Sequence, residues 1–112
     1  MKTKKITITQ KEEKALRNLK EELNRKFHLI DFKIFGSRVK GAKNSESDID
    51  VMIEINNSSY EVESTIDDII YEINLENDSF ISAIIFTKEE LINGTMSESP
   101  LYKAILRDGV QF

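Results

Sequence analysis

The sequence predicts an α/β (α+β) domain in which a small mixed sheet is flanked by helices. Stretches with helical apolar spacing alternate with short runs rich in β-branched and aromatic residues. The chain has 112 residues, 39% of them hydrophobic, and no repeat or linker rich in Pro, Gly or Ser divides it. A chain of this size buries one modest core. We therefore expect a single domain over residues 1–112.

The first half of the chain contains signals for one helix and two strands. Thr9 with Glu12 three residues later is a helix-capping pattern. Apolar residues then recur at helical spacing through residue 27, namely Ala15, Leu16, Leu19, Leu23 and Phe27. The run LIDFKIF, residues 29–35, predicts a strand that stops at Gly36. Residues 37–47 predict a short helical turn and a loop, and the alternating IDVMIEI, residues 49–55, predicts a second strand.

The second half continues the alternation. A second amphipathic helix is expected to about residue 75, with its stripe at Val62, Ile66, Ile69, Ile70 and Ile73. The run FISAIIF, residues 80–86, predicts a third strand, and Thr87 with Glu90 caps a short helix that Gly94 ends. The pair Ser99 and Pro100 opens a last helix, which stops at Gly109.

Composition excludes several classes of function. The formal net charge is −4, so the overall field does not favour broad binding to nucleic acid or to a membrane surface. The absence of cysteine excludes disulfides, a thiolate nucleophile and a thiolate zinc site. No window approaches the roughly 20 apolar residues that span a bilayer. We expect a soluble, cytoplasmic protein without direct nucleic-acid binding.

The turn after the first strand has the features of an anion-binding site. A glycine there allows a sharp turn and close approach of a ligand, and Ser37 presents a hydroxyl. Arg38 and Lys40, with Lys43 nearby, make this stretch locally positive and suited to a triphosphate. The alternative is an ordinary capped turn whose charges are solvated.

Two aspartates follow at the start of the second strand. Ten residues separate Ser37 from Asp48, and Asp50 lies two positions further on. Alternation along a strand places both aspartates, with Met52 and Glu54, on one face. Their oxygens can then converge on one or two hard cations, of which Mg²⁺ is the natural choice. The alternative is a polar strand face that meets only solvent.

The combination of GSRVKG and SDIDVMI resembles the nucleotidyltransferase signature of the DNA polymerase β superfamily. In so short a chain it looks like the minimal nucleotidyltransferases, which are commonly encoded beside a HEPN-domain protein as an antitoxin and toxin pair. The resemblance is strong over residues 32–54 and otherwise rests on the order and length of the elements.

The resemblance implies a polymerase β-like fold and a set of site residues. Gly36 and Ser37 would hold the phosphates of ATP or another nucleoside triphosphate, with Arg38 or Lys40 as supporting cations. Asp48 and Asp50 would be the catalytic metal ligands, for up to two Mg²⁺ ions. The implied activity is transfer of a nucleoside monophosphate, AMP from ATP, to a hydroxyl of a partner protein, with a HEPN toxin as the target.

One departure from the family pattern keeps other functions open. The superfamily usually supplies a third carboxylate from a neighbouring strand, and Ser82 stands where we expect it. Asp78 or Glu54 could substitute, although the motif positions neither. A binding module with weakened catalysis, which neutralises a partner by docking, is therefore an alternative. A small-molecule modifier is a third, although the chain lacks an evident second substrate domain.

Overall fold

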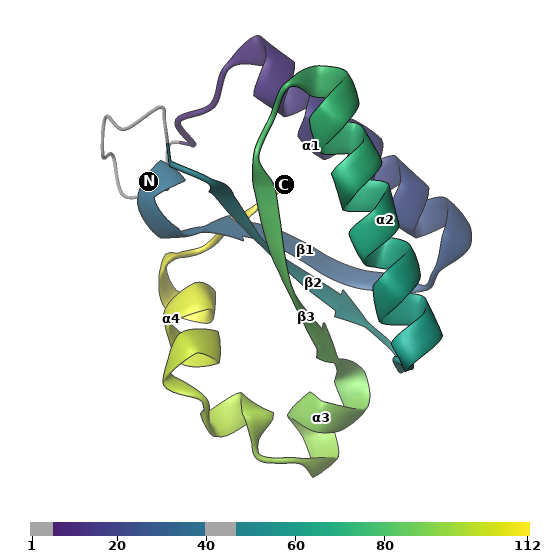
Figure 1. Cartoon of the computed structure of the whole chain (residues 1–112). Helices are drawn as coiled ribbons and strands as arrows, with labels where there is room; N and C mark the ends of the chain where they lie inside the picture. Colours follow the sequence, from purple (N-terminus) through teal and green to yellow (C-terminus); the bar gives the residue numbers. More distant parts are fainter. Residues whose placement is uncertain (1–5, 40–46) are drawn as a thin grey trace.

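The computed structural model describes residues 6–39 and 47–112 of the chain (Figure 1). Lys40 and Lys43 lie outside these residues. The elements in chain order are α1 (Gln10–Lys26), β1 (Leu29–Phe35), the 3₁₀ turn η1 (Gly36–Arg38), β2 (Ile49–Ile55), α2 (Tyr60–Asn77), β3 (Ile81–Thr87), α3 (Lys88–Asn93), the 3₁₀ turn η2 (Met96–Glu98), α4 (Pro100–Asp108) and β4 (Val110–Gln111).

The strands form one mixed sheet in the order β3-β2-β1-β4. Strand β1 is antiparallel to both β2 and β4, whereas β2 and β3 are parallel and are joined by α2. The mixed sheet flanked by helices confirms the predicted fold class. The start of β2 therefore lies beside the end of β1 and the start of β3.

One face of the sheet is sealed by α1 and α2, which lie together on that side in Figure 1. The odd residues of β2 point into this core and are almost completely buried, and most of the apolar stripe of each helix is buried against them. The buried members are Ala15, Leu16, Leu19, Leu23, Phe32, Ile34, Ile49, Val51, Ile53, Ile55, Ile66, Ile70, Ile73 and Ile81. This layer supplies the apolar burial that holds the strands in register.

The opposite face is covered over only part of its length. Met52, Phe86 and Ile105 form a second, smaller cluster, to which α4 contributes Ile105. Met52 thus lies on the face that alternation predicts, but α4 buries it, so this face is apolar in its middle. Towards the start of β2, Asp50 is half-buried and Asp48 is exposed.

Local sequence signals set the ends of the helices. Thr9 and Glu12 form the predicted capping box, and Thr87 and Ser99 accept from the backbone N–H groups that the cap patterns predict. The two-residue strand β4 was not predicted, because it exists only through its pairing with β1. Among the described residues, no helix combines the length and the apolar character needed to cross a membrane.

Candidate functional site

The turn that follows β1 has the backbone shape that requires glycine. Gly36 has φ +80°, a conformation that side chains other than glycine rarely adopt. A Cβ at this position would lie 2.6 Å from Oδ2 of Asp50, inside van der Waals contact. The absence of a side chain at Gly36 therefore lets the Asp50 carboxylate lie directly against the turn.

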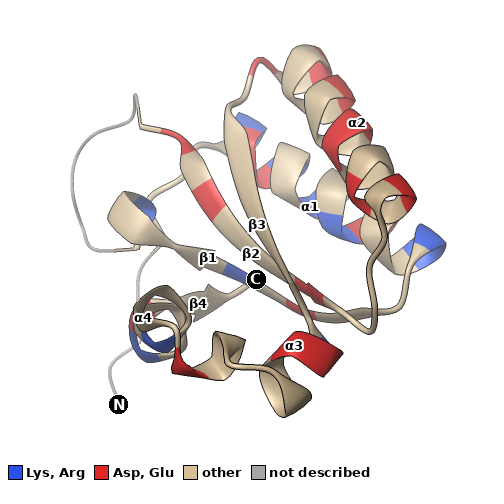
Figure 2. Ribbon diagram, turned by 60° about the horizontal axis from the view of Figure 1, so that its bottom comes forward, with Lys and Arg blue, Asp and Glu red and all other residues tan. Residues whose placement is uncertain are grey.

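The two aspartates come to this turn from the start of β2, where the ribbon has red bands in Figure 2. Asp50 is paired with Phe35 of β1, the residue immediately before the turn. Asp48 immediately precedes the strand and is exposed. The structure thus brings the predicted residues Gly36, Asp48 and Asp50 to one edge of the sheet.

The electrostatics of this edge disfavour negative charge. Burial raises the pKa of the Asp50 carboxyl above its usual value, and the neighbouring negative charge of Asp48 raises it further. A cation placed between these carboxylates would relieve the penalty.

Ser82 occupies the position on β3 that we expected for a third carboxylate. In the parallel register it is the direct partner of Asp50, so both side chains project from the same face of the sheet. Ser82 is exposed. The serine therefore leaves an oxygen atom, but no charge, beside Asp50.

The two carboxylates that might replace it are elsewhere. Asp78 caps the C-terminus of α2 in a left-handed conformation, and its Oδ2 lies 3.3 Å from Nζ of Lys11. Glu54 lies four residues beyond Asp50 on β2, two pleat repeats away, opposite Asp31 of β1. Among the described residues, no group of three or more His, Cys, Asp or Glu is arranged to hold a metal ion.

Arg38 differs most from its expected placement. Its side chain is only 2% exposed and forms a two-bonded ion pair with Glu12, at 2.8 and 3.0 Å. It also donates to the backbone oxygen of Thr7 and to both oxygens of Ser47. The guanidinium therefore ties the turn to the start of α1 and does not reach outward as a phosphate-binding cation would.

Ser37 is connected to the same group of residues. Its Oγ lies 2.9 Å from Oγ of Ser47, and the residue is partly exposed. Sequence reasoning missed Ser47 and the second role of Glu12. The capping pattern predicts only the helix-start role of Glu12, and no local signal links it to Arg38, which lies 26 residues away.

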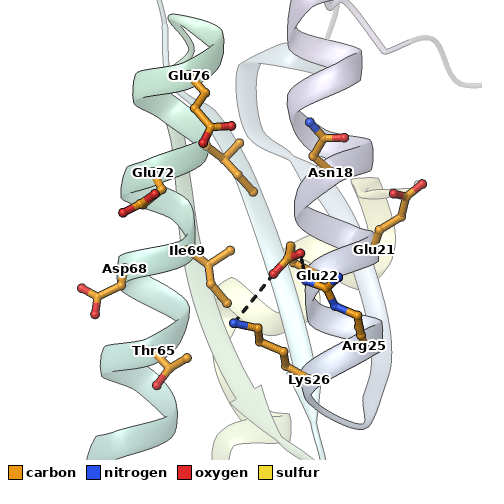
Figure 3. Close-up of a pocket in the computed structure, with 11 residues that line it drawn as sticks. Asn18, Glu21, Glu22, Arg25, Lys26, Thr65, Asp68, Ile69, Glu72 and Glu76 are labelled. Carbon is orange, nitrogen blue, oxygen red and sulfur yellow. Dashed lines mark hydrogen bonds and ion pairs between the residues drawn. The ribbon is translucent and has the colours of Figure 1, made fainter.

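A groove lies on a different part of the molecule, between α1 and α2 (Figure 3). Its volume is about 700 Å³, and it contains none of the predicted site residues. Its rim is charged, with Glu22 paired to Arg25 and Lys26. The candidate site at Asp50 is defined by the polar groups that converge there, and none of them lines this groove.

Comparison with known proteins points to one family. A family model described as a nucleotidyltransferase domain matches residues 16–106. No curated protein matches the chain significantly in sequence. A crystal structure from Sulfolobus solfataricus, described as a "putative nucleotidyltransferase", is similar with a TM-score of 0.50 and 21% sequence identity. The match covers 94% of this chain and 87% of that one, and it supports the fold.

Proposed function

Because this chain belongs to the nucleotidyltransferase domain family, we propose that it transfers a nucleoside monophosphate from a nucleoside triphosphate, AMP from ATP, to a hydroxyl of a partner protein. The proposed reaction depends on Mg²⁺, with Asp48 and Asp50 as its ligands. The partner that we propose is a HEPN-domain toxin, on the strength of the resemblance of the GSRVKG and SDIDVMI motifs to the minimal nucleotidyltransferases.

The observation that carries the proposal is the contact between Gly36 and Asp50. A Cβ on Gly36 would meet the Asp50 carboxylate at 2.6 Å, so the turn after β1 lies against one of the two proposed metal ligands. Phosphate and a hard cation bind together when a triphosphate is the substrate. This adjacency supports a metal–triphosphate site better than either motif alone.

The residues at this edge fit Mg²⁺. Two carboxylates with hydroxyl oxygens nearby are a hard donor set, and Mg²⁺ commonly takes one or two protein carboxylates and completes its shell with phosphate oxygens and water. The raised pKa of Asp50, caused by burial and by Asp48, is a penalty that a divalent cation would remove. When bound, the metal would lower the pKa of the attacking hydroxyl and neutralise charge on the triphosphate.

The chain's own residues have simpler tasks in this proposal. Gly36 leaves room for the triphosphate to approach the backbone, and the Ser37 hydroxyl donates to a phosphate oxygen. In the reaction a bond forms between the acceptor oxygen and the α-phosphorus while the bond to pyrophosphate breaks. The proton of the acceptor hydroxyl passes to solvent. Positioning the two reactants is the main contribution of the protein.

A second candidate function has its own support. Ser82 places an uncharged side chain beside Asp50, at the position of the family's usual third carboxylate. A site with two carboxylates holds a metal less firmly, so the chain would bind a nucleotide weakly and act on its partner by docking. This second function needs the fold but no chemical step.

The two functions are separated by following label from ATP. The chain is incubated with Mg²⁺ and ATP labelled at the α-phosphate, with and without the HEPN-domain partner. The test variant is Asp48→Asn/Asp50→Asn, and the matched control is Asp67→Asn/Asp68→Asn on the exposed face of α2. Transfer predicts label on the partner with the wild type and the control only. Inhibition of the partner by the test variant without any label would overturn transfer and favour docking.

A further inference from the structure

Arg38 is the most thoroughly bonded side chain near the candidate site. A guanidinium has five N–H donors, and five hydrogen bonds join this one to other described residues. Nη1 donates to Thr7 O at 3.1 Å and to Glu12 Oε1 at 2.8 Å, Nη2 donates to Glu12 Oε2 at 3.0 Å and to Ser47 O at 2.7 Å, and Nε donates to Ser47 Oγ at 3.1 Å. Lysine has three donors on one nitrogen and cannot reproduce this pattern.

The hydrogen bonds of Arg38 to Glu12 and Thr7 hold it at the start of α1. Glu12 Oε1 also accepts from the backbone N–H of Thr9 at 2.9 Å, as part of the capping box of α1. The backbone N–H of Thr7 donates to the backbone oxygen of Arg38 at 2.8 Å. Arg38 is thereby fixed to the start of the helix that seals the main core, so its position is set by the fold and not by a ligand.

The other hydrogen bonds of Arg38 connect it to the candidate site through Ser47. The Ser47 carbonyl that accepts from Arg38 belongs to the peptide bond preceding Asp48. The Ser47 hydroxyl accepts from Arg38 Nε and lies 2.9 Å from the Ser37 hydroxyl. One guanidinium therefore holds both the entry to the carboxylate pair and the serine of the turn.

Arg38 Nε, the Ser47 hydroxyl and the Ser37 hydroxyl form a chain of hydrogen bonds. Which atom donates at each step follows from the two ends of this chain. Arg38 can only donate, and a bound phosphate oxygen can only accept. With phosphate at Ser37, the chain must run from Arg38 Nε to Ser47 Oγ, from Ser47 to Ser37, and from Ser37 to the phosphate. Each donation strengthens the next one in such a chain.

We propose that Arg38 is a positioning residue of the nucleotide site, which acts through Ser47 to hold the Ser37 hydroxyl as a donor toward a bound phosphate. The inference rests on the proposed function, because it needs a phosphate at Ser37. It assigns Ser47, the first residue of SDIDVMI, an indirect part in nucleotide affinity that the motif itself does not indicate.

The test measures the Kd of the full chain for Mg²⁺-ATP and for Mg²⁺-tripolyphosphate, which has no base. The variants are Ser37→Ala, Ser47→Ala and the double variant. Each single variant is expected to weaken both probes about tenfold, as for a lost hydrogen bond to a charged group. The double variant is expected to be no weaker than about tenfold, because the two hydroxyls act in series.

Three further variants separate positioning from folding. Ser47→Thr keeps the hydroxyl and is expected to restore the Kd to within about twofold of the wild type. Ser64→Ala, at an exposed serine of α2, is the matched control and leaves both Kd values unchanged. Arg38→Lys is expected to weaken binding at least tenfold. Melting temperatures identify any part of that loss which comes from unfolding.

The outcomes that overturn the inference are distinct from those that overturn the function. If the wild type binds both probes and Ser47→Ala binds them equally well, Arg38 and Ser47 are structural only. An additive, roughly hundredfold loss in the double variant also contradicts action in series. If the wild type binds neither probe, the proposed function fails and this inference fails with it.

Discussion

The side chains of β2 project alternately to the two faces of the sheet, and the two faces differ in how far they are covered. On one face, Ile49, Val51 and Ile53 are completely buried under α1 and α2. On the other face, Asp50 is only half-buried, and Asp48 just before the strand is exposed. A single strand thus has its position fixed by one set of side chains while the alternate set is left available to a ligand.

The two faces contribute differently to stability and to the proposed function. Apolar burial on the covered face stabilises the folded state. The open face holds two nearby carboxylates whose mutual repulsion adds to the effect of burial in raising the pKa of Asp50. Retaining such an unfavourable pair is characteristic of functional sites, where stability is commonly given up for activity.

The largest predicted effect concerns the covered face. Ile53→Ala is expected to lower the free energy of unfolding by about 3 kcal/mol and the Tm by roughly 10 °C or more, because it leaves a cavity in the main core. Ser82→Ala on the open face should change stability by less than about 0.5 kcal/mol. Thermal and urea unfolding measure both. Equal effects of the two substitutions would refute the division between the faces.

The ion pair between Arg38 and Glu12 is predicted to make the stability of the protein depend on pH. Burial opposes ionisation of Glu12, but the hydrogen bonds and charge of Arg38 and the hydrogen bonds of Thr9 outweigh it and lower the pKa of Glu12. The unfolded chain then binds more protons in the range below 4.5, so the Glu12 contribution is present above that value and is lost as the pH falls through the lowered pKa.

Glu12→Gln tests this link. At pH 7 the variant should be less stable by about 2 kcal/mol, because it leaves the buried guanidinium without its counter-charge. Its stability should also decline less steeply than that of the wild type as the pH falls below 4.5. Urea unfolding at several pH values checks both points. Parallel pH profiles for the two proteins would show that the Arg38–Glu12 pair does not contribute in this way.

Gly36→Ala is expected to have a smaller effect on stability, of about 1–2 kcal/mol, from the positive φ and the contact with Asp50. It should also weaken Mg²⁺-ATP binding, because the turn and the carboxylate can no longer lie together. Adding Asp50→Ala removes the carboxylate that the new methyl group meets. The stability loss caused by Gly36→Ala should therefore be smaller in that background, and an unchanged loss would mean that the contact is not the cause.

The smallest predicted effect on stability comes from Ser82→Asp, which should instead raise the affinity for Mg²⁺. Ser82→Asp adds a carboxylate beside Asp50 in register, so it should tighten Mg²⁺ binding several-fold and raise the pKa of Asp50 further by repulsion. Ser82→Asn has a similar size without the charge and serves as the control. Mg²⁺ titration followed by calorimetry gives the affinities. No difference between the two variants would place the metal away from β3.

The fold was largely predictable because its signals are local. Thr9, Thr87 and Ser99 each mark a helix start within a few residues of sequence, and alternation along residues 49–55 predicts which side chains share a face. The strand β4 and the burial of Met52 were not predictable in this way. Both depend on elements that are distant in the sequence, β1 for the first and α4 for the second.

The same distinction applies to the site. The turn at Gly36 and the register of Ser82 with Asp50 agree with expectation, because both follow from strand order and periodicity. The placement of Arg38 does not. A basic residue in a phosphate-binding motif resembles a phosphate ligand in sequence, and only the folded chain shows that Glu12 is its partner. The nucleotide-binding roles of Gly36, Ser37, Arg38 and Lys40 stay predictions, as do the metal-binding and catalytic roles of Asp48 and Asp50.

The location of the ligand is tested most directly by titrating the ¹⁵N-labelled chain with Mg²⁺-ATP and following the backbone amide resonances. The proposed site predicts the largest shifts at residues 36–39, 47–51 and 82, with little change along the groove between α1 and α2. The shifts should disappear in Asp48→Asn/Asp50→Asn. Shifts centred on Glu22, Ile69 and Glu72 of the groove, and retained in that variant, would contradict a nucleotide site at the open edge of the sheet.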